Sequence, residues 1–588
     1  MSAKHFINDP THLVTTALRS LTYTNPSVAL DEENKIIYRR PDKHGHQVAL
    51  ISGGGSGHEP SFSAFVGPGL LSAAITGTIF ASPSAEQVRR AIQGRVDPKR
   101  GVLVIVMNYT GDVLNFGMAV EKAKASGLNV EMVVVGDDVG VGRKKAGKVG
   151  RRGIAGTVLV QKVAGALAAT GAPLDVVFKA AQLTSKNLAS VGASLSHVHV
   201  PGREQPDPNS EENLDLEEIE IGMGIHNEPG FARVKMELPE LVKTMLSQLL
   251  DTEDNDRAFL HLSPKDEVVL LINNLGGVSP LELSGVTAEV VEQLRDHYKV
   301  DPVRIFSGTY MTSLSGQGFS ITILKVADLG LGSGKSMVEL LEAPSEATGW
   351  TRGVSAEVWD RRSDAVKEED AALQEETKPS NLTVDPAKMK KVLTSGLESL
   401  IEAEPDVTKY DTIVGDGDCG IGLKRGAESI LALLEKTKLS EDALLNISSI
   451  ISVIELSMDG TSGALYAIFL NALAHGLRVQ SPPSPKPATP EVWARALQIS
   501  LESLGQYTPA KPGDRTLIDA LEPFVNTLSE TNDPKKAAEA ARKGSEGTKG
   551  MKASLGRTVY VGGEGWQGVP DPGAHGLSVF LSGIAEAM

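Results

Sequence analysis

The sequence predicts an α/β half with mixed, largely parallel sheets, followed by an all-α half. In the first half, continuous runs of Val, Ile and Leu alternate with helical stretches, as in βαβ units whose strands are buried on both faces. These runs lie at 46–51, 102–107, 130–136, 266–273 and 319–326. In the second half, apolar residues recur every three or four positions, which is the pattern of amphipathic helices.

Residues 344–383 are predicted to be a linker between a first domain, 1–343, and a second domain, 384–588. Much of this stretch is polar and charged and has little to bury. A flexible coil of about 40 residues has a root-mean-square reach of about 35 Å. Either domain could therefore meet the other in its own chain or in a partner.

Composition narrows the class of protein further. The 588 residues are 41% hydrophobic and 22% charged, as in ordinary globular proteins, and the net charge of −16 argues against a broad basic face for nucleic acid. Cys419 is the single cysteine, so neither an intrachain disulfide nor a cysteine-based zinc site can form. No apolar run reaches the roughly 18 residues of a membrane span. We expect a cytoplasmic protein without nucleic-acid or membrane partners.

Three carboxylates lie close together in the sequence YDTIVGDGDCG, at Asp411, Asp416 and Asp418. They repel one another unless a cation neutralises them, and Mg²⁺ is the cation that carboxylates hold beside phosphate oxygens. A solvated Asp/Gly turn is the alternative.

Two further glycine-rich turns each open a helix, DGTSG at 459–463 and DPGAHG at 571–576. Free N–H groups at a helix start attract anions, and Thr461 and Ser462 add hydroxyl groups. Each turn alone is more often a simple N-cap. Together with the carboxylates they predict a nucleotide-phosphate site at one end of a helical bundle.

In the first half, the chemistry is expected in loops at strand ends, where ligands bind in parallel sheets. The glycine-rich stretch SGGGSGHEP after the first run carries His58, and NYTGD after the second carries Asp112. A third loop, HNEPG, begins with His226, whose imidazole can act as a nucleophile when a second group holds its tautomer. A turn residue or a buried structural histidine is the alternative at each position.

The motifs GDGDCG, DGTSGALY, GDRTLIDAL and DPGAHG resemble the ATP-binding domain of the dihydroxyacetone kinase family. This resemblance implies an antiparallel helical barrel in which carboxylates hold two Mg²⁺ ions that bridge the ATP phosphates. The implied metal ligands are Asp411, Asp416 and Asp418. The implied ATP contacts are Asp416, Gly417, Asp418, Cys419, Thr461, Ser462, Arg515, Arg557, Asp571, Pro572 and Gly573.

The first-half motifs, with FINDP, SHVHVPG and GTYMTSL, resemble the substrate domain of the same family, so the resemblance spans essentially the whole chain. It implies that His226 forms a covalent hemiaminal with the substrate carbonyl carbon, which excludes glycerol. His226, Asp112 and His58 are the implied catalytic residues. The implied substrate contacts are Gly55, Ser56, Gly57, His58 and Asp112. One departure is Met107, where many members carry Lys.

The function that this resemblance implies is ATP-dependent phosphorylation of dihydroxyacetone, with D-glyceraldehyde as a second substrate, by a homodimer. Two alternatives stay open. One is a regulator that binds nucleotide or dihydroxyacetone without catalysis, and the other is an additional FAD-AMP lyase activity that cyclises FAD to a flavin 4′,5′-cyclic phosphate. The presence of His226 and all three aspartates favours catalysis.

Overall fold

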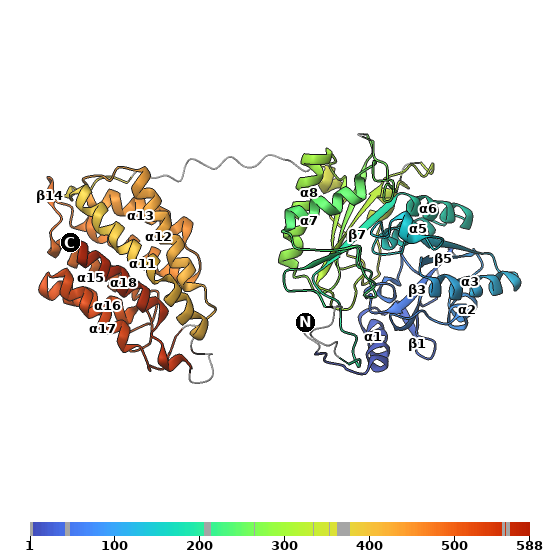
Figure 1. The fold of residues 1–588 in the computed structure, drawn as a ribbon, viewed down its shortest axis with the longest axis horizontal. Coiled ribbons are helices and arrows are strands. Elements are labelled where there is room, and N and C mark those ends of the chain that lie inside the picture. Colours follow the sequence, from blue (N-terminus) through green and yellow to red (C-terminus); the bar gives the residue numbers. More distant parts are fainter. Residues whose placement is uncertain are drawn as a thin grey trace. The chain divides into compact units, whose positions relative to one another are not determined.

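In the computed structural model, the chain divides into two units, residues 1–365 and 366–588 (Figure 1). The first unit contains two sheets with their helices, and the second is helical apart from one short strand pair. The predicted order of an α/β half and an all-α half is therefore confirmed. The residues described are 4–41, 47–204, 213–263, 265–332, 334–351, 353–360, 377–555, 559 and 565–588.

The first sheet of the α/β unit is mixed, with strand order β1-β2-β4-β3-β5-β6. Strands β4, β3, β5 and β6 run parallel, whereas β1 pairs antiparallel with β2, and β2 with β4. Helices α2 and α3 cover one face and α5 and α6 the other, which explains why β5 is buried at every residue. The strands are β1 Val28–Asp31, β2 Ile36–Arg39, β3 Ala49–Ser56, β4 Ala73–Ile79, β5 Val102–Met107 and β6 Val130–Val135. The helices are α1 Pro10–Thr24, η1 Ser63–Phe65, α2 Ala85–Gly94, α3 Thr110–Ala125, α4 Arg143–Ala146, α5 Thr157–Ala169 and α6 Leu174–Lys186.

The second sheet has the order β11-β10-β12-β7-β8-β9 and is mainly antiparallel, since only the β10–β11 pair is parallel. The prediction of largely parallel sheets is wrong for this sheet. Its central strands are buried on both faces, so they show the same continuous apolar runs as parallel strands. Its strands are β7 Leu188–Ser194, β8 Ile219–Ile221, β9 Ala232–Val234, β10 Val268–Asn274, β11 Arg304–Gly308 and β12 Gly318–Lys325, and its helices are α7 Leu238–Leu250 and α8 Pro280–Tyr298. Two short helices follow in the chain, α9 Met337–Glu342, which packs on α5, and α10 Ala356–Asp360.

The glycine-rich stretch after residue 51 is a strand and not the loop that the sequence predicts. Strand β3 continues through it to Ser56. A Cβ atom on Gly55 would lie 2.8 Å from the backbone nitrogen of Ala81. The backbone at Ala81 therefore leaves no room for a side chain at residue 55. The glycines thus let β3 reach the site edge, where His58 follows directly.

The predicted linker is too long at both ends. Residues 344–350 pack on the α/β unit, where Trp350 is buried against the aromatic rings of Phe306 and Tyr310. At the other end, Ser380 is buried and its hydroxyl donates to the carboxylate of Asp442 in the helical unit. The central part of the predicted linker, 361–376, lies outside the described residues.

The helical unit consists of long helices that surround an apolar cavity of about 630 Å³, in agreement with the expected barrel. Helix α11 packs against both α12 and α18. Within the described residues, no helix of either unit is long and apolar enough to span a bilayer. The elements are β13 Leu382–Thr383, α11 Pro386–Val414, α12 Cys419–Lys436, α13 Ala443–Ser457, α14 Gly460–Val479, β14 Lys486–Pro487, α15 Pro490–Leu504, α16 Ile518–Thr531, α17 Pro534–Gly547, η4 Gly565–Gly568 and α18 Pro572–Ala587.

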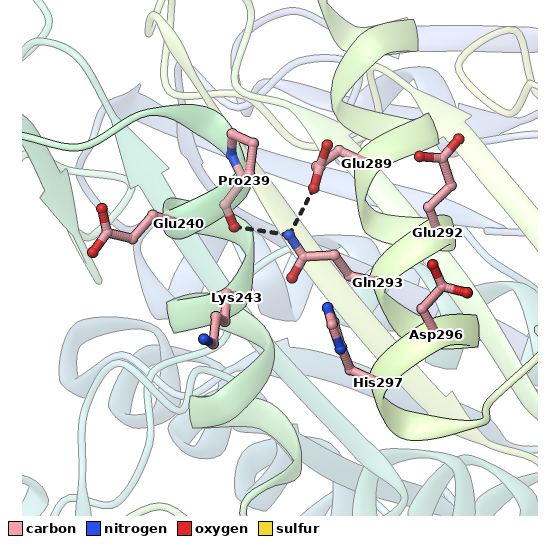
Figure 2. Close-up of a pocket in the computed structure, with 8 residues that line it drawn as sticks. All are labelled: Pro239, Glu240, Lys243, Glu289, Glu292, Gln293, Asp296 and His297. Atoms are coloured by element: carbon pink, nitrogen blue, oxygen red, sulfur yellow. Dashed lines mark hydrogen bonds between the residues drawn. The ribbon is translucent and has the colours of Figure 1, made fainter.

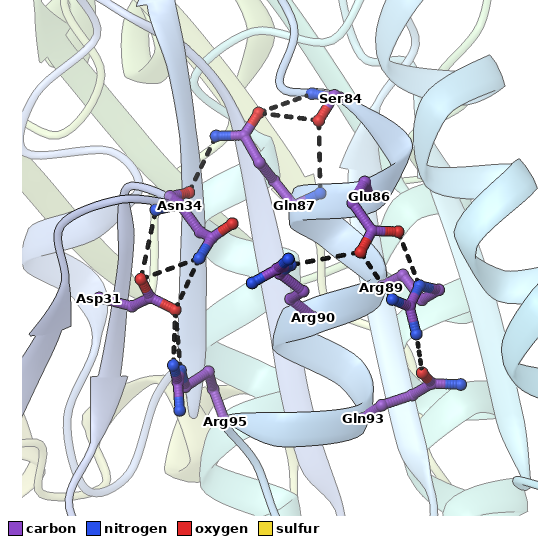
Figure 3. A network of polar contacts seen from close by, with 9 residues as sticks. All are labelled: Asp31, Asn34, Ser84, Glu86, Gln87, Arg89, Arg90, Gln93 and Arg95. Carbon is purple, nitrogen blue, oxygen red and sulfur yellow. Dashed lines mark hydrogen bonds and ion pairs between the residues drawn. The ribbon is translucent and has the colours of Figure 1, made fainter.

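Polar contacts fix the outer helices of the α/β unit. Figure 3 shows Asp31 at the end of β1 accepting hydrogen bonds from Arg95 at 2.8 and 2.9 Å, which ties the β1–β2 hairpin to the end of α2. A groove of about 460 Å³ lies between α7 and α8. In it, the Gln293 amide donates to the Pro239 carbonyl at 2.8 Å and to Glu289 at 2.7 Å (Figure 2). The first network joins the β1–β2 hairpin to α2, and the second joins α7 to α8.

Candidate active site

His226 belongs to a chain of hydrogen bonds that fixes the protons of two facing histidines. Its Nδ1 lies 2.9 Å from Glu228 Oε1, and its Nε2 lies 3.1 Å from Nε2 of His58. Nδ1 of His58 lies 2.8 Å from the carbonyl oxygen of Thr312. Because a carbonyl only accepts, His58 donates through Nδ1, and by the same argument His226 donates through Nδ1 to the Glu228 carboxylate. A hydrogen bond between the two Nε2 atoms then needs a proton on one of them, whereas in the neutral rings each Nε2 presents a lone pair.

The surrounding groups favour the neutral form of His58 and the ionised form of Glu228. His58 is fully buried, and burial together with the charge on His226 lowers the pKa of His58 to about 3. Burial acts to raise the pKa of Glu228, but its hydrogen bonds with His226, the charge of protonated His226 and, as the smallest of these effects, the charge of Arg152 hold that pKa at about 2. At neutral pH, His58 is therefore neutral and Glu228 is ionised. A neutral His226 offers its Nε2 lone pair as a nucleophile.

Asp112 is a buried carboxyl group in the first turn of α3. Burial raises the pKa of Asp112 to about 6, against the opposing effects of a Ser82 hydrogen bond and the charge on His226. Its Oδ1 is buried without a hydrogen-bond partner among the described residues. Its Oδ2 would lie 3.6 Å from a Cβ on Gly54 in β3. A carboxylate with this pKa can accept a proton near neutral pH.

Two aromatic residues that the sequence analysis missed form walls around the histidines. The Phe80 ring stacks on His58 at a centroid distance of 5.4 Å, and the Tyr109 ring lies 4.7 Å from the His226 ring. Tyr109 lies in the NYTGD motif and could have been singled out with Asp112. Phe80 lies just beyond the end of β4, and its sequence surroundings carry no comparable signal.

The three predicted substrate contacts before His58 lie against these walls. Gly57 has φ of +100°, and a Cβ there would lie 2.7 Å from the Phe80 ring, so both the backbone and the space require glycine. The Ser56 hydroxyl is buried and donates to the Gly77 carbonyl at 2.9 Å. Gly55, Ser56 and Gly57 shape the wall in this way, and their direct contact with substrate stays a prediction.

The carboxylates Asp411, Asp416 and Asp418 lie together in the helical unit, as the sequence predicts. Each offers an oxygen, and these oxygens all lie within 4.8 Å of one another. Asp411 is the buried member, and its Oδ2 accepts the backbone N–H of Cys419 at 3.0 Å. Gly417 has φ of +81°, which turns the chain between the two exposed aspartates. Oxygen ligands at this spacing fit a hard divalent cation such as Mg²⁺.

The starts of α12 and α14 face the same region. The Cys419 sulfur lies 4.0 Å from the hydroxyl oxygen of Ser462. Burial, with the negative charge of Asp411, raises the pKa of the Cys419 thiol to about 12, so the thiol stays protonated. Thr461 is exposed beside Ser462 in the first turn of α14. These two hydroxyls and the free N–H groups of the turn are suited to hold phosphate oxygens.

The Asp571-Pro572-Gly573 turn opens α18 close to the carboxylate cluster. Asp571 accepts the N–H of Ala574 at 2.8 Å as an N-cap. Burial raises the pKa of Asp571 to about 7, and the charges of Asp519 and Asp411 add to that rise. Asp519, which the sequence analysis did not single out, lies in the GDRTLIDAL motif and holds its loop through the N–H groups of Gly513 and Thr516.

Arg515 does not have the place that the sequence predicts. Its side chain is 1% exposed, and its two Nη groups donate to four backbone carbonyls, those of Thr548, Met551, Trp566 and Val569. A direct contact with ATP is thus corrected to a structural role, because no N–H of the two Nη groups is turned to solvent. The other predicted arginine, Arg557, lies outside the described residues.

Comparison with known proteins shows the family of the chain. The chain matches two protein-family models, the Dak1 domain over residues 19–349 and the DAK2 domain over residues 413–586. Dihydroxyacetone kinase 1 of Saccharomyces cerevisiae is 43% identical over 603 residues, and human triokinase/FMN cyclase is 34% identical over 602 residues; each match covers 100% of both chains. The crystal structure of the dihydroxyacetone kinase from C. freundii in complex with AMP-PNP and Mg²⁺ has a TM-score of 0.62 at 32% identity and covers 100% of both chains.

The fold, the two sites and these relatives define a kinase whose phosphoryl acceptor is an alcohol group. The chain belongs to the dihydroxyacetone kinase family. The family resemblance seen in the motifs is therefore confirmed over the whole chain.

Proposed function

We propose that this chain phosphorylates dihydroxyacetone with ATP, that it also accepts D-glyceraldehyde, and that it holds the substrate as a hemiaminal on His226. The observation that supports this most is the fixed tautomer of His226, whose Nδ1 proton is held by Glu228. Both substrates have a carbonyl carbon that an imidazole nitrogen can attack, and glycerol has none. The names of the yeast and human relatives point to the same substrate class.

The adduct forms without any co-reactant. Nε2 of His226 bonds to the carbonyl carbon, and the π pair of the C=O bond moves to oxygen. That oxygen takes up a proton while Nδ1 releases one through Glu228, so no net proton is consumed. His58 and Phe80 lie against the His226 ring and exclude water from the new bond.

Phosphoryl transfer then uses a hydroxyl group of the bound substrate. Its oxygen attacks the γ-phosphorus of ATP, the bond to the β,γ-bridging oxygen breaks, and ADP leaves. The hydroxyl proton passes to Asp112, whose pKa of about 6 leaves it ionised at neutral pH. Asp112 is therefore the general base in this proposal, and His58 shares the orienting role.

The helical unit is proposed to bind ATP through the three aspartates, the Ser462 turn and the Asp571 turn. Asp411, Asp416 and Asp418 would hold two Mg²⁺ ions, which supply positive charge for the phosphate oxygens. The AMP-PNP and Mg²⁺ in the C. freundii structure support this assignment.

ADP release is the direct test. The purified chain is given Mg²⁺ and ATP with dihydroxyacetone, D-glyceraldehyde or glycerol in separate reactions. Release with the first two and not with glycerol supports the proposal. Release that does not depend on the acceptor contradicts it, and no release at all would favour the regulator that only binds its ligands.

Cyclisation of FAD is a second candidate function, because the human relative is named a triokinase/FMN cyclase. The reaction would need the nucleotide site of the helical unit and not the carbonyl chemistry of His226. Incubation with FAD and a divalent cation should then release a flavin cyclic phosphate from both the native chain and His226→Ala. Absence of that product from the native chain removes this candidate.

A homodimer in which one chain's ATP site serves the other's substrate site is also proposed. Mixing the His226→Ala and Asp416→Asn proteins tests it. If the ATP site of one chain acts on the substrate site of the other, random subunit exchange should restore about a quarter of the native activity. No recovery after verified subunit exchange contradicts it.

A cytoplasmic location goes with this proposal, because ATP is available there and a chain with Cys419 as its single cysteine needs no oxidising compartment. Cell fractionation with an antibody to the chain tests it. Recovery in a secreted or membrane fraction would contradict it.

A further inference from the structure

Arg152 lies behind the Glu228–His226 pair and is anchored by other groups. Its Nε donates to Asp138 Oδ2 at 2.8 Å, and its Nη2 donates to the Gly222 carbonyl at 2.7 Å. Its side chain is 15% exposed and that of Asp138 only 2%. The backbone of Asp138 also donates to the Arg152 carbonyl. The guanidinium group is therefore held in one place.

The side chains of Arg152 and Glu228 approach each other beside the backbone of Gly224. A Cβ on Gly224 would lie 2.0 Å from Glu228 Oε2 and 2.5 Å from Arg152 Nη1. Any side chain at this position would push the two charged groups away. The third nitrogen of the anchored guanidinium thus lies beside the carboxylate that holds His226.

We propose that Arg152 is a positioning residue whose positive charge, held beside Glu228, offsets the attraction of that carboxylate for a second proton on the His226 ring, so that Nε2 stays available to the substrate carbonyl. This inference rests on the proposed function, because it concerns the same nucleophile. Met107, at the end of β5, has a buried apolar side chain and brings no cation to the site. Arg152 is the positive charge that acts on both Glu228 and Tyr109 beside His226.

Glu228 and Arg152 act in opposite directions on protonation of the His226 ring. The groups that face His226 are His58, Asp112, Tyr109 and Glu228, with Arg152 behind Glu228. Glu228 alone would favour the protonated ring, which has no free lone pair at Nε2. The opposite charge of Arg152 offsets that effect. Loss of Arg152 should therefore move protonation of the site to higher pH, and loss of the Glu228 charge should move it to lower pH.

The test follows the adduct by carbon-13 NMR, with dihydroxyacetone labelled at the carbonyl carbon and no ATP. The signal measured is the protein-bound tetrahedral carbon, as a function of pH. The variants are Arg152→Gln, the charge-keeping Arg152→Lys and the isosteric Glu228→Gln. Because loss of Arg152 removes the partner of buried Asp138, Asp138→Asn/Arg152→Gln is added as a variant with a neutral pair. Exposed Lys144→Met controls for the change of net charge.

We expect the pH at which the adduct is lost on acidification to rise by about 0.5–1 pH unit in Arg152→Gln and in the double variant. It should fall in Glu228→Gln and stay in place in Arg152→Lys and Lys144→Met. A merely structural role would lower the adduct signal at every pH without opposite shifts, and that result overturns the inference. If the native chain shows no tetrahedral signal at any pH, the hemiaminal itself fails, which is a different outcome.

Discussion

The substrate site of the α/β unit and the nucleotide site of the helical unit differ in how their charges are balanced. Around His226, the two histidines and Glu228 have defined partners, and the Arg152 and Glu228 charges lie side by side. Around Asp411, three carboxylates come together, and Asp571 adds a fourth acidic group whose pKa is raised. The first site is preorganised by the protein alone, whereas the second is built to be completed by cations.

The two sites are therefore suited to select their ligands in different ways. In the proposed mechanism, a preorganised nucleophile selects the substrate by its carbonyl group, and the Phe80 ring stacks on His58 beside it. An acidic cluster at helix starts selects by charge, so it suits any nucleotide that brings its own divalent cations. Substitutions in the two units should therefore have separable effects on substrate capture and on nucleotide binding.

The largest effect is expected for His226→Ala. Without Nε2 as nucleophile, kcat/KM for dihydroxyacetone should fall by about 10³-fold or more. Binding of Mg²⁺ and AMP-PNP, measured by calorimetry, should not change, because that site is in the other unit. Turnover close to the native value would contradict the covalent account.

Asp416→Asn should have the next largest effect and the opposite pattern. The loss of one carboxylate weakens cation binding, so activity at fixed Mg²⁺ should fall by about 10²-fold and partly recover at higher Mg²⁺. The carbon-13 adduct should remain. The exposed Glu402→Gln on α11, the helix that precedes Asp416, is the matched control. Loss of the adduct in Asp416→Asn would disprove the separation.

Asp112→Asn should lower kcat by about 10²-fold while the adduct still forms. The pKa of Asp112 is raised to about 6 by burial, so below that pH its carboxyl group is protonated and cannot accept the hydroxyl proton. The native kcat should therefore decrease as pH falls through about 6. A pH–rate profile with the same acid limb in Asp112→Asn would assign that limb to another group.

Arg515→Lys should have the smallest effect on chemistry and a clear effect on stability. One ammonium group cannot serve four carbonyls, so unfolding free energy should fall by about 2–4 kcal/mol. Thermal unfolding is the measurement, with exposed Lys511→Met as control. If Arg515→Lys kept its stability and lost ATP affinity, Arg515 would be a nucleotide contact after all.

Much of the architecture could be predicted because burial leaves a direct pattern in sequence. Strand β5 coincides with the apolar run at 102–107, and the helical periodicity of the second half predicted an all-α unit, which α11 to α18 form. The direction of the strands in the second sheet could not be read, since fully buried strands of either kind have the same composition. The packing of Trp350 depends on partners far away in the sequence, so the linker boundary was placed too early.

The site residues also divide into those that a local motif reveals and those whose role depends on distant contacts. His58, His226 and the three aspartates stand in glycine-rich motifs whose chemistry is local, and the structure brings each set together. Arg515 also stands in a motif, but its role depends on four carbonyls up to 54 residues away, which no local pattern shows. Arg152 was missed because its partners Asp138, Gly222 and Glu228 come from two other loops.

The most direct test of the central claim is the state of the substrate carbonyl carbon before ATP takes part. Labelled dihydroxyacetone is added to the native chain without Mg²⁺ or nucleotide, and the carbon-13 spectrum is compared with that of His226→Ala. We predict a protein-bound tetrahedral signal, distinct from the hydrate of the free ketone, that is absent from the variant. A spectrum with only the free ketone and its hydrate in both samples would contradict the account.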